Sequence, residues 1–163
     1  MRAVGSTLGA LALAIVLAAC GGGKPSVPRS AASEWTANAV GVIDQLRADA
    51  VAADDGDSVS SARAALHDDS RLYGLVVAYS DFGGCRHMVG AAGDPPLGFR
   101  AVQVTLARAC ANLQRAASLF TRAASRTDAP ALVAAARAVL VGAPLLDRAE
   151  LELRSTARAT IEG

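Results

Sequence analysis

The sequence is poor in aromatic residues and in the residue clusters that favour β-strands. Among its 163 residues are one Trp, two Tyr and three Phe, and clusters of Val, Ile, Thr and aromatic residues are nearly absent. Such clusters are typical of strands, whereas the abundant alanine has the highest intrinsic helix propensity. The composition therefore argues against a sheet and predicts an all-α fold.

The sequence also lacks the short motifs that accompany common catalytic and cofactor sites. It has no Gly-x-Ser-x-Gly, no Cys-x-x-Cys, no Cys-x-x-Cys-His and no Gly-rich phosphate loop. We therefore expect no catalytic site, no cofactor and no enzymatic activity. The alternative is an enzyme whose site residues form no recognisable local motif.

The first twenty residues have the layout of a secretory signal. Arg2 is the only charged residue before an apolar run over 8–19. A run of about a dozen residues is short for a spanning helix, which needs about 20, but suits a signal peptide. The run ends in Leu17-Ala18-Ala19-Cys20, which resembles the lipobox of bacterial lipoproteins.

This resemblance implies a lipid anchor. In that family the signal, here residues 1–19, is cut off before the cysteine, and a diacylglycerol is attached to the sulfur, here that of Cys20. We therefore expect a protein of the cell envelope, held on the outer side of the cytoplasmic membrane, or to an outer membrane where the cell has one. The alternative is an ordinary signal followed by a chance cysteine.

Downstream of Cys20 the sequence predicts a tether and one domain. Residues 20–30 are rich in Gly and Pro, which is typical of a flexible link. The remaining 31–163 have the length of one ordinary domain. This division places the lipid outside the folded core.

Within 31–163, apolar residues recur at helical spacing in four segments, 33–53, 58–88, 97–125 and 129–159. The last two each repeat an apolar residue every seven positions, as Phe99, Leu106, Leu113 and Phe120, and as Leu132, Val139, Leu146 and Leu153. Such repeats place one apolar face along a helix, and short connections favour antiparallel neighbours. We therefore expect an antiparallel four-helix bundle. A break near Asp69, a weak point at Gly83-Gly84 and a kink at Pro144 are also expected.

Cys85 and Cys110 are the two cysteines left once Cys20 carries lipid. An even pair in an oxidising compartment is most often a disulfide, and both residues lie on or near apolar stripes. We therefore expect a Cys85–Cys110 disulfide. Two buried thiols or a redox site are the alternatives.

The polar clusters do not predict a metal site. His67-Asp68-Asp69 and His87 belong to one helical segment, in which twenty residues would separate the histidines by about 30 Å. The run 54–57 lacks the glutamate of a calcium loop and is better explained as a helix end and cap. We therefore expect no metal ligands.

Glu150 falls near the apolar stripe of the last segment. Its carboxylate needs either an arginine from a neighbouring helix or a frayed, exposed helix end. The exposed end is the commoner solution, and we expect it here.

Charge is unevenly distributed along the chain. Residues 24–69 hold four basic and eight acidic side chains, and residues 70–163 hold eleven basic and seven acidic ones. One interpretation is a basic face for acidic partners such as lipid headgroups or wall polymers. The interpretation we favour is that early acidic helices neutralise later basic helices within the bundle.

Taken together, these features predict a non-enzymatic envelope lipoprotein that binds or scaffolds a partner. Its expected contacts are the membrane, through Cys20, and an envelope protein or polymer, with no nucleic acid outside the cytoplasm. The alternative function is a carrier of a small apolar ligand in a cavity between helices.

Overall fold

The computed structural model describes the backbone of residues 29–162 and the side chains in that range except at 29–30, 55–56 and 161–162. This part of the chain is helical and contains no strand, which confirms the all-α prediction. Its elements are α1 (Arg29–Ala52), the 3₁₀-helix η1 (Ala53–Gly56), α2 (Val59–His67), α3 (Asp69–Ala91), α4 (Arg100–Arg126) and α5 (Ala129–Glu162). The expected signal, Cys20 and the first residues of the expected tether lie outside the described residues.

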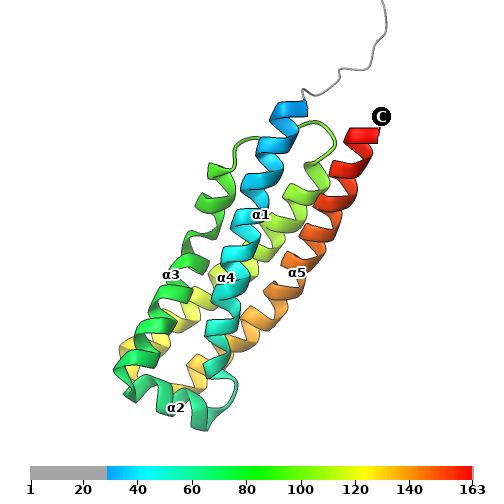
Figure 1. The fold of residues 1–163 in the computed structure, drawn as a ribbon. Coiled ribbons are helices and arrows are strands. Elements are labelled where there is room, and N and C mark those ends of the chain that lie inside the picture. The colour runs from blue at the N-terminus through cyan, green and yellow to red at the C-terminus, as the bar shows by residue number, and fades with distance from the viewer. Residues whose placement is uncertain (1–28, 163) are drawn as a thin grey trace, which may run out of the picture.

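The four long helices lie side by side, and α2 crosses one end of them (Figure 1). Around the assembly, α1 packs against α3 and α5, and α4 packs against the same two helices from the other side. α1 begins at the end of the molecule where α5 ends, and α2 lies at the opposite end together with the α4–α5 turn (Figure 1).

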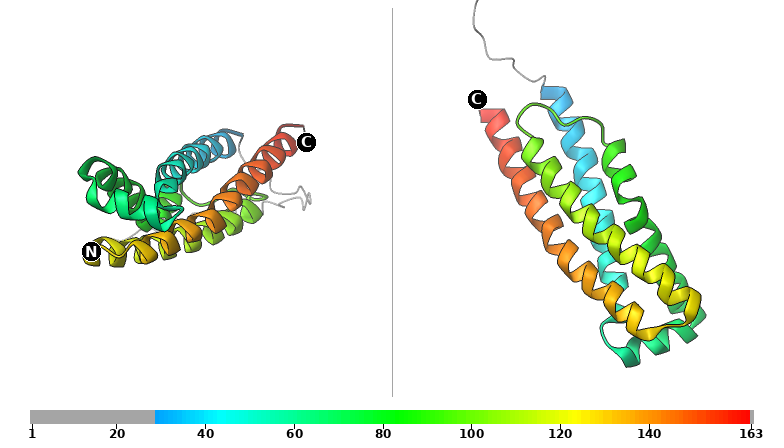
Figure 2. Two further views of the ribbon diagram at one scale, coloured as in Figure 1. Left: turned by 90° about the horizontal axis from the view of Figure 1, so that it is seen from below. Right: turned by 180° about the vertical axis from the view of Figure 1, so that it is seen from behind.

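Two layers follow from this arrangement. Seen from behind, α4 and α5 lie next to each other and form one side of the molecule (Figure 2). The helices α1 and α3 form the other layer. The α4–α5 pair is also the most extensive contact between two elements.

The second expected segment is two helices, not one. Asp68 takes an extended conformation between α2 and α3, and its side chain accepts hydrogen bonds from the backbone N–H groups of Ser70 and Arg71. This cap stabilises the start of α3 by satisfying donors that have no partner inside the helix. The predicted break is therefore present one residue earlier than expected. The cap of α2 is Ser58, which accepts from the Ser61 N–H, and not Asp57.

Other expected irregularities are not breaks. α3 continues through Gly83-Gly84 to Ala91, and α5 continues through Pro144 as one helix. Pro144 is exposed, so its ring faces solvent. Because proline has no backbone N–H, the carbonyl four residues earlier in the helix has no partner there, and water can bond to it instead. The expected tether is also too long by two residues, because α1 already begins at Arg29.

The core runs the length of the four long helices. The largest side chains with under 2% exposure are Phe82, Phe99, Ile43, Leu46, Leu75, Leu106, Leu113, Leu132, Leu146, Leu153, Val102 and Cys85. This set includes most of the apolar residues that recur every seven positions in the last two segments predicted from the sequence. The connection between α3 and α4 closes one end of the core, because the Trp35 indole donates to the Gly93 carbonyl at 3.1 Å and packs against Phe99.

By length and composition alone, α5 could cross a membrane over Ala129–Thr160. Its apolar face packs against α4, α1 and α2. The core helix of a globular domain passes the same test, and we interpret α5 as such a helix.

Candidate functional site

The two cysteines of the domain are joined. Cys85 of α3 and Cys110 of α4 form a disulfide, with their Cα atoms 5.4 Å apart and both residues fully buried. It ties together two helices that pack in the core, as expected from the sequence. The lipidation site expected at Cys20 lies outside the described residues.

The histidines are not brought together into a cluster. His67 is the last residue of α2 and His87 lies in α3, and both are exposed. Within residues 29–162, the described side chains include no group of three His, Cys, Asp or Glu residues placed to hold a metal ion.

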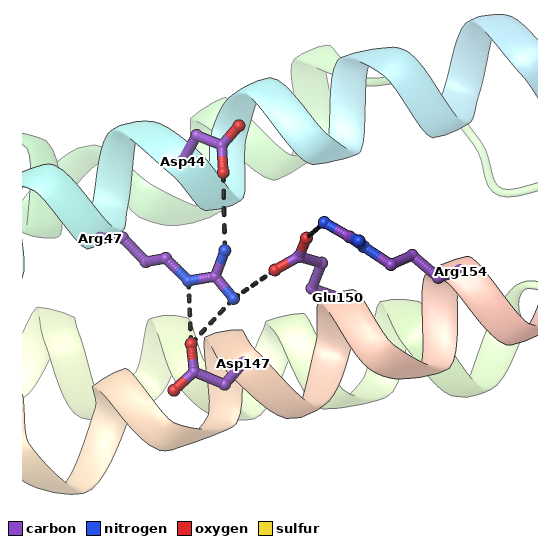
Figure 3. A network of polar contacts seen from close by, with 5 residues as sticks. All are labelled: Asp44, Arg47, Asp147, Glu150 and Arg154. Carbon is purple, nitrogen blue, oxygen red and sulfur yellow. Dashed lines mark hydrogen bonds and ion pairs between the residues drawn. The ribbon is translucent and has the colours of Figure 1, made fainter.

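A polar network joins α1 to α5 around Arg47 (Figure 3). The Arg47 guanidinium donates to Asp147 through Nε at 2.9 Å and Nη2 at 2.8 Å, and Nη2 lies 2.5 Å from Glu150 Oε2. Asp44 lies 3.5 Å from Nη1, and Arg154 pairs with the other oxygen of Glu150. Every charged group in the network has an opposite partner, so it acts as a structural tie rather than as a site for a ligand.

This network corrects the expectation for Glu150. Its side chain is only 13% exposed and has two arginine partners, so it is not at a frayed end. Hydrogen bonds from Arg47 and then from Arg154 lower the pKa of its carboxyl. Arg47 lies on a different helix, far from Glu150 in the chain, and has no special position in the sequence pattern, which is why the pairing was not favoured.

A second polar contact joins α1 to α3. Asp49 of α1 is only 6% exposed. The side-chain amide of Gln45 donates to both carboxylate oxygens of Asp49 at 3.4 Å, and it also donates to Oδ2 of Asp81 on α3 at 3.1 Å. Burial, and then the nearby charge of Asp81, raise the pKa of Asp49 to about 6. The sequence pattern did not predict this pair, although Asp49 lies one helical turn beyond the core residue Leu46.

Basic residues gather on the side formed by α4 and α5. α4 contains five arginines and no acidic residue, and Arg108, Arg115 and Arg122 are spaced by seven positions along it. All three are exposed. Within the described range, no arginine of α4 or α5 pairs with a carboxylate of α1, η1, α2 or α3. The favoured expectation, that early acidic helices neutralise the later basic ones, is therefore wrong for these two helices.

A groove on this side runs between α4 and α5. It has a volume of about 430 Å³ and is lined by Asn112, Arg115 and Leu119 of α4 and by Pro130, Val133, Ala134, Arg137, Ala138 and Val141 of α5. Neither Arg115 nor Arg137 has an ion-pair partner among the described residues. The groove therefore offers two guanidinium groups and an amide beside an apolar floor.

No model of a known protein family, no curated protein and no solved structure matches the chain.

The polar side chains of this groove are of a kind that can bind anions. Guanidinium groups stay charged at every physiological pH and donate hydrogen bonds in a fixed planar fork that suits carboxylates and phosphates. An apolar floor beside them suits a ligand that has an anionic and an apolar part. We call the surface formed by Arg115, Arg122, Arg137 and this groove the arginine face.

The sequence contained part of this signal. The seven-residue spacing of the α4 arginines and the absence of acidic residues from 100–126 can both be read from the letters. What could not be read is that α5 places Arg137 beside Arg115 and that, among the described side chains, no carboxylate forms an ion pair with either of them.

Proposed function

We propose that the protein is an envelope lipoprotein, anchored through lipid on Cys20, whose domain is a non-enzymatic binding module for an anionic partner. In this proposal the signal 1–19 is removed, and the domain is an antiparallel four-helix bundle crossed at one end by α2. The partner binds at the arginine face. The protein lies on the outer side of the cytoplasmic membrane, or at an outer membrane where the cell has one.

The observation that carries the binding role is the pair of arginines without ion-pair partners at the α4–α5 groove. The carboxylates of Asp147, Glu150 and Glu152 farther along α5 already have arginine partners. Arg115 and Arg137 have none among the described residues and lie beside exposed apolar surface at Val141, which is 60% exposed. Such an arrangement gives an anion both charge and geometry to bind.

The polar groups of the groove also favour binding over catalysis. They are two guanidiniums and one amide, which donate hydrogen bonds to anions and are not among the side chains that usually act as general acids or bases. The non-enzymatic role therefore remains our proposal.

The alternative, a carrier of a small apolar ligand inside the bundle, has less support. A Cβ added at Gly142 would lie 3.0 Å from Cδ2 of the fully buried Leu113, so α4 and α5 approach closely beside Pro144. A cavity between these two helices would have to open in this region. Close approach of the two helices is better explained by tight packing.

The proposal is tested with envelope fragments prepared from host cells that lack the protein. The mature chain carrying Cys20→Ser, which cannot be lipidated, is mixed with the fragments, and the bound fraction is measured after sedimentation. We expect binding by this chain and a large loss with Arg115→Gln/Arg137→Gln. The matched control Arg63→Gln/Arg86→Gln removes the same charge from exposed positions on α2 and α3.

Equal binding by the two double variants would overturn the role of the arginine face. The anchor is tested separately by fractionating cells that make the wild-type or the Cys20→Ser protein. Wild-type protein should stay with membranes after a high-salt wash, and the variant should not carry lipid.

A further inference from the structure

We infer that the arginine face binds an anionic phospholipid surface, so that the anchored domain lies on its side along the membrane. This inference rests on the proposed lipid anchor and on the proposed anion-binding role, and it names the partner. Three features of the described domain support it: the charge along the face, its shape, and the position of α1 relative to it.

The charge along the face is of one sign over a long stretch. From Arg100 to Leu146, the two helices carry no carboxylate; Asp128, in the turn between them, caps α5 by accepting from the Ala131 N–H. Farther along α5, Asp147 pairs with Arg47, and Glu152 pairs with Arg148 and accepts from Thr105 at 2.7 Å. An anionic surface therefore meets unpaired arginines and few unpaired carboxylates along this side of the molecule.

The shape suits an extended surface. Arg108 and Arg122 are fourteen residues apart on a straight stretch of α4, which corresponds to about 21 Å at 1.5 Å per residue. Arg137 lies across the groove on α5, beside Arg115. The arginines thus spread over both helices of one layer, as Figure 2 shows for the helices themselves. Between them, the half-buried Leu119 and the exposed Val141 provide apolar contacts for the region just below lipid headgroups.

The anchor can reach in this orientation. α1 belongs to the layer away from the arginine face, so its start would be about 15 Å above a surface that touches α4 and α5, given a helix radius of about 5 Å and an interaxial distance of 8–10 Å. Eight residues lie between Cys20 and Arg29, and a chain of that length spans up to about 30 Å. The lipid on Cys20 and the arginine face can therefore contact the same membrane. A wall polymer would satisfy the charge but would make less use of the apolar floor.

The test uses vesicles and the mature chain carrying Cys20→Ser, so that binding cannot come from the lipid anchor. Vesicles of phosphatidylglycerol mixed with phosphatidylcholine are compared with vesicles of phosphatidylcholine alone at increasing salt. An arginine near an anionic surface contributes roughly a fivefold factor to partitioning, so Arg115→Gln/Arg137→Gln should weaken binding about 25-fold. Arg63→Gln/Arg86→Gln should weaken it by much less, and binding should fall with salt and be absent without the anionic lipid.

The inference is wrong if the wild-type chain does not bind the anionic vesicles, or if the two double variants lose the same affinity. Thermal unfolding of each variant shows that it is folded before binding is measured. Should the chain ignore vesicles yet bind envelope fragments through Arg115 and Arg137, the lipid inference fails and the proposed anion-binding role survives. If neither binds, both are overturned.

Discussion

Tyr79 is buried without a hydrogen-bond partner for its hydroxyl among the described residues. The residue is 2% exposed, its ring stacks on Phe120 with centroids 4.4 Å apart, and burial raises the pKa of its hydroxyl. A buried donor without a partner costs about 1–3 kcal/mol. The hydroxyl therefore opposes folding while the ring supports it.

Replacing this hydroxyl should stabilise the domain. We expect Tyr79→Phe to raise the free energy of unfolding by about 1 kcal/mol, because the ring contacts remain and the unpaired group is removed. The control is Tyr73→Phe on the same helix, where the side chain is 71% exposed and no change is expected. Urea unfolding measures both. A clear loss of stability in Tyr79→Phe would mean that its hydroxyl has a partner after all.

Asp49 makes stability depend on pH. Its pKa is about 6 in the folded domain against an ordinary value of 3.8, so between these values the folded state binds more protons than the unfolded state. Its contribution to stability is therefore complete below about pH 4 and is lost as the pH rises through 6. Since solvent reaches the neighbouring Asp81 and screens the pair, we expect a loss of about 1–2 kcal/mol.

The variant Asp49→Asn should remove most of this dependence. Its free energy of unfolding, measured from pH 4.5 to 7.5, should fall less than that of the wild type and should exceed it at pH 7. Glu34→Gln, an exposed change on the same helix, should follow the wild-type curve. Parallel curves for wild type and Asp49→Asn would show that another group controls the pH response.

At the scale of helices, two glycines in helix interiors have opposite surroundings. In the interior of a helix, alanine is more favourable than glycine by a free energy of up to about 1 kcal/mol. At Gly41 of α1 a Cβ would meet nothing within 4 Å, whereas at Gly142 of α5 it would lie 3.2 Å from Leu113 Cγ and 3.3 Å from Asn112 Cβ. Because Leu113 is fully buried, it has little room to move, and crowding it costs about 1–3 kcal/mol.

We therefore expect Gly41→Ala to raise the unfolding free energy by about 0.5–1 kcal/mol and Gly142→Ala to lower it by about 1 kcal/mol. Denaturant unfolding of both variants gives the difference directly. Equal stabilisation by the two substitutions would mean that α4 and α5 are not closely packed at this point.

The sequence predicted helices well because helix formation depends on near neighbours. The seven-residue repeat of 97–125 and 129–159 identifies α4 and α5 within a few residues, and the polar run at His67–Ser70 predicts a break. Contacts between helices, such as Arg47 with Glu150, depend on packing that local periodicity does not determine.

At the scale of the whole molecule, the disulfide links the two layers through α3 and α4. It closes a loop with a sequence separation of 25 residues, and on the chain-entropy model such a link contributes about 3–4 kcal/mol. We expect Cys85→Ala/Cys110→Ala to lose most of this stability in thermal unfolding. Mass spectrometry of protein exported by its own host should show two added hydrogens on reduction, and free thiols before reduction would contradict the link.

The distribution of charge is also a property of the whole molecule. From the sequence, acidic and basic halves suggested mutual neutralisation, because the arginines are spread among acidic residues and are not clustered. In the fold, the ion pairs of Asp147 and Glu150 use Arg47 of the early, acidic half. The arginines of α4 are left on the outside, and this placement supports the proposed binding role.

Arginine footprinting of the protein in its own envelope tests that central claim most directly. A dicarbonyl reagent that modifies exposed guanidiniums is applied to intact envelopes and to the mature Cys20→Ser chain in solution, and modification is measured residue by residue by mass spectrometry. We predict protection of Arg115, Arg122 and Arg137 in the envelope and unchanged reactivity of Arg63 and Arg86. Equal reactivity of all five arginines in the two samples would contradict a partner on the arginine face.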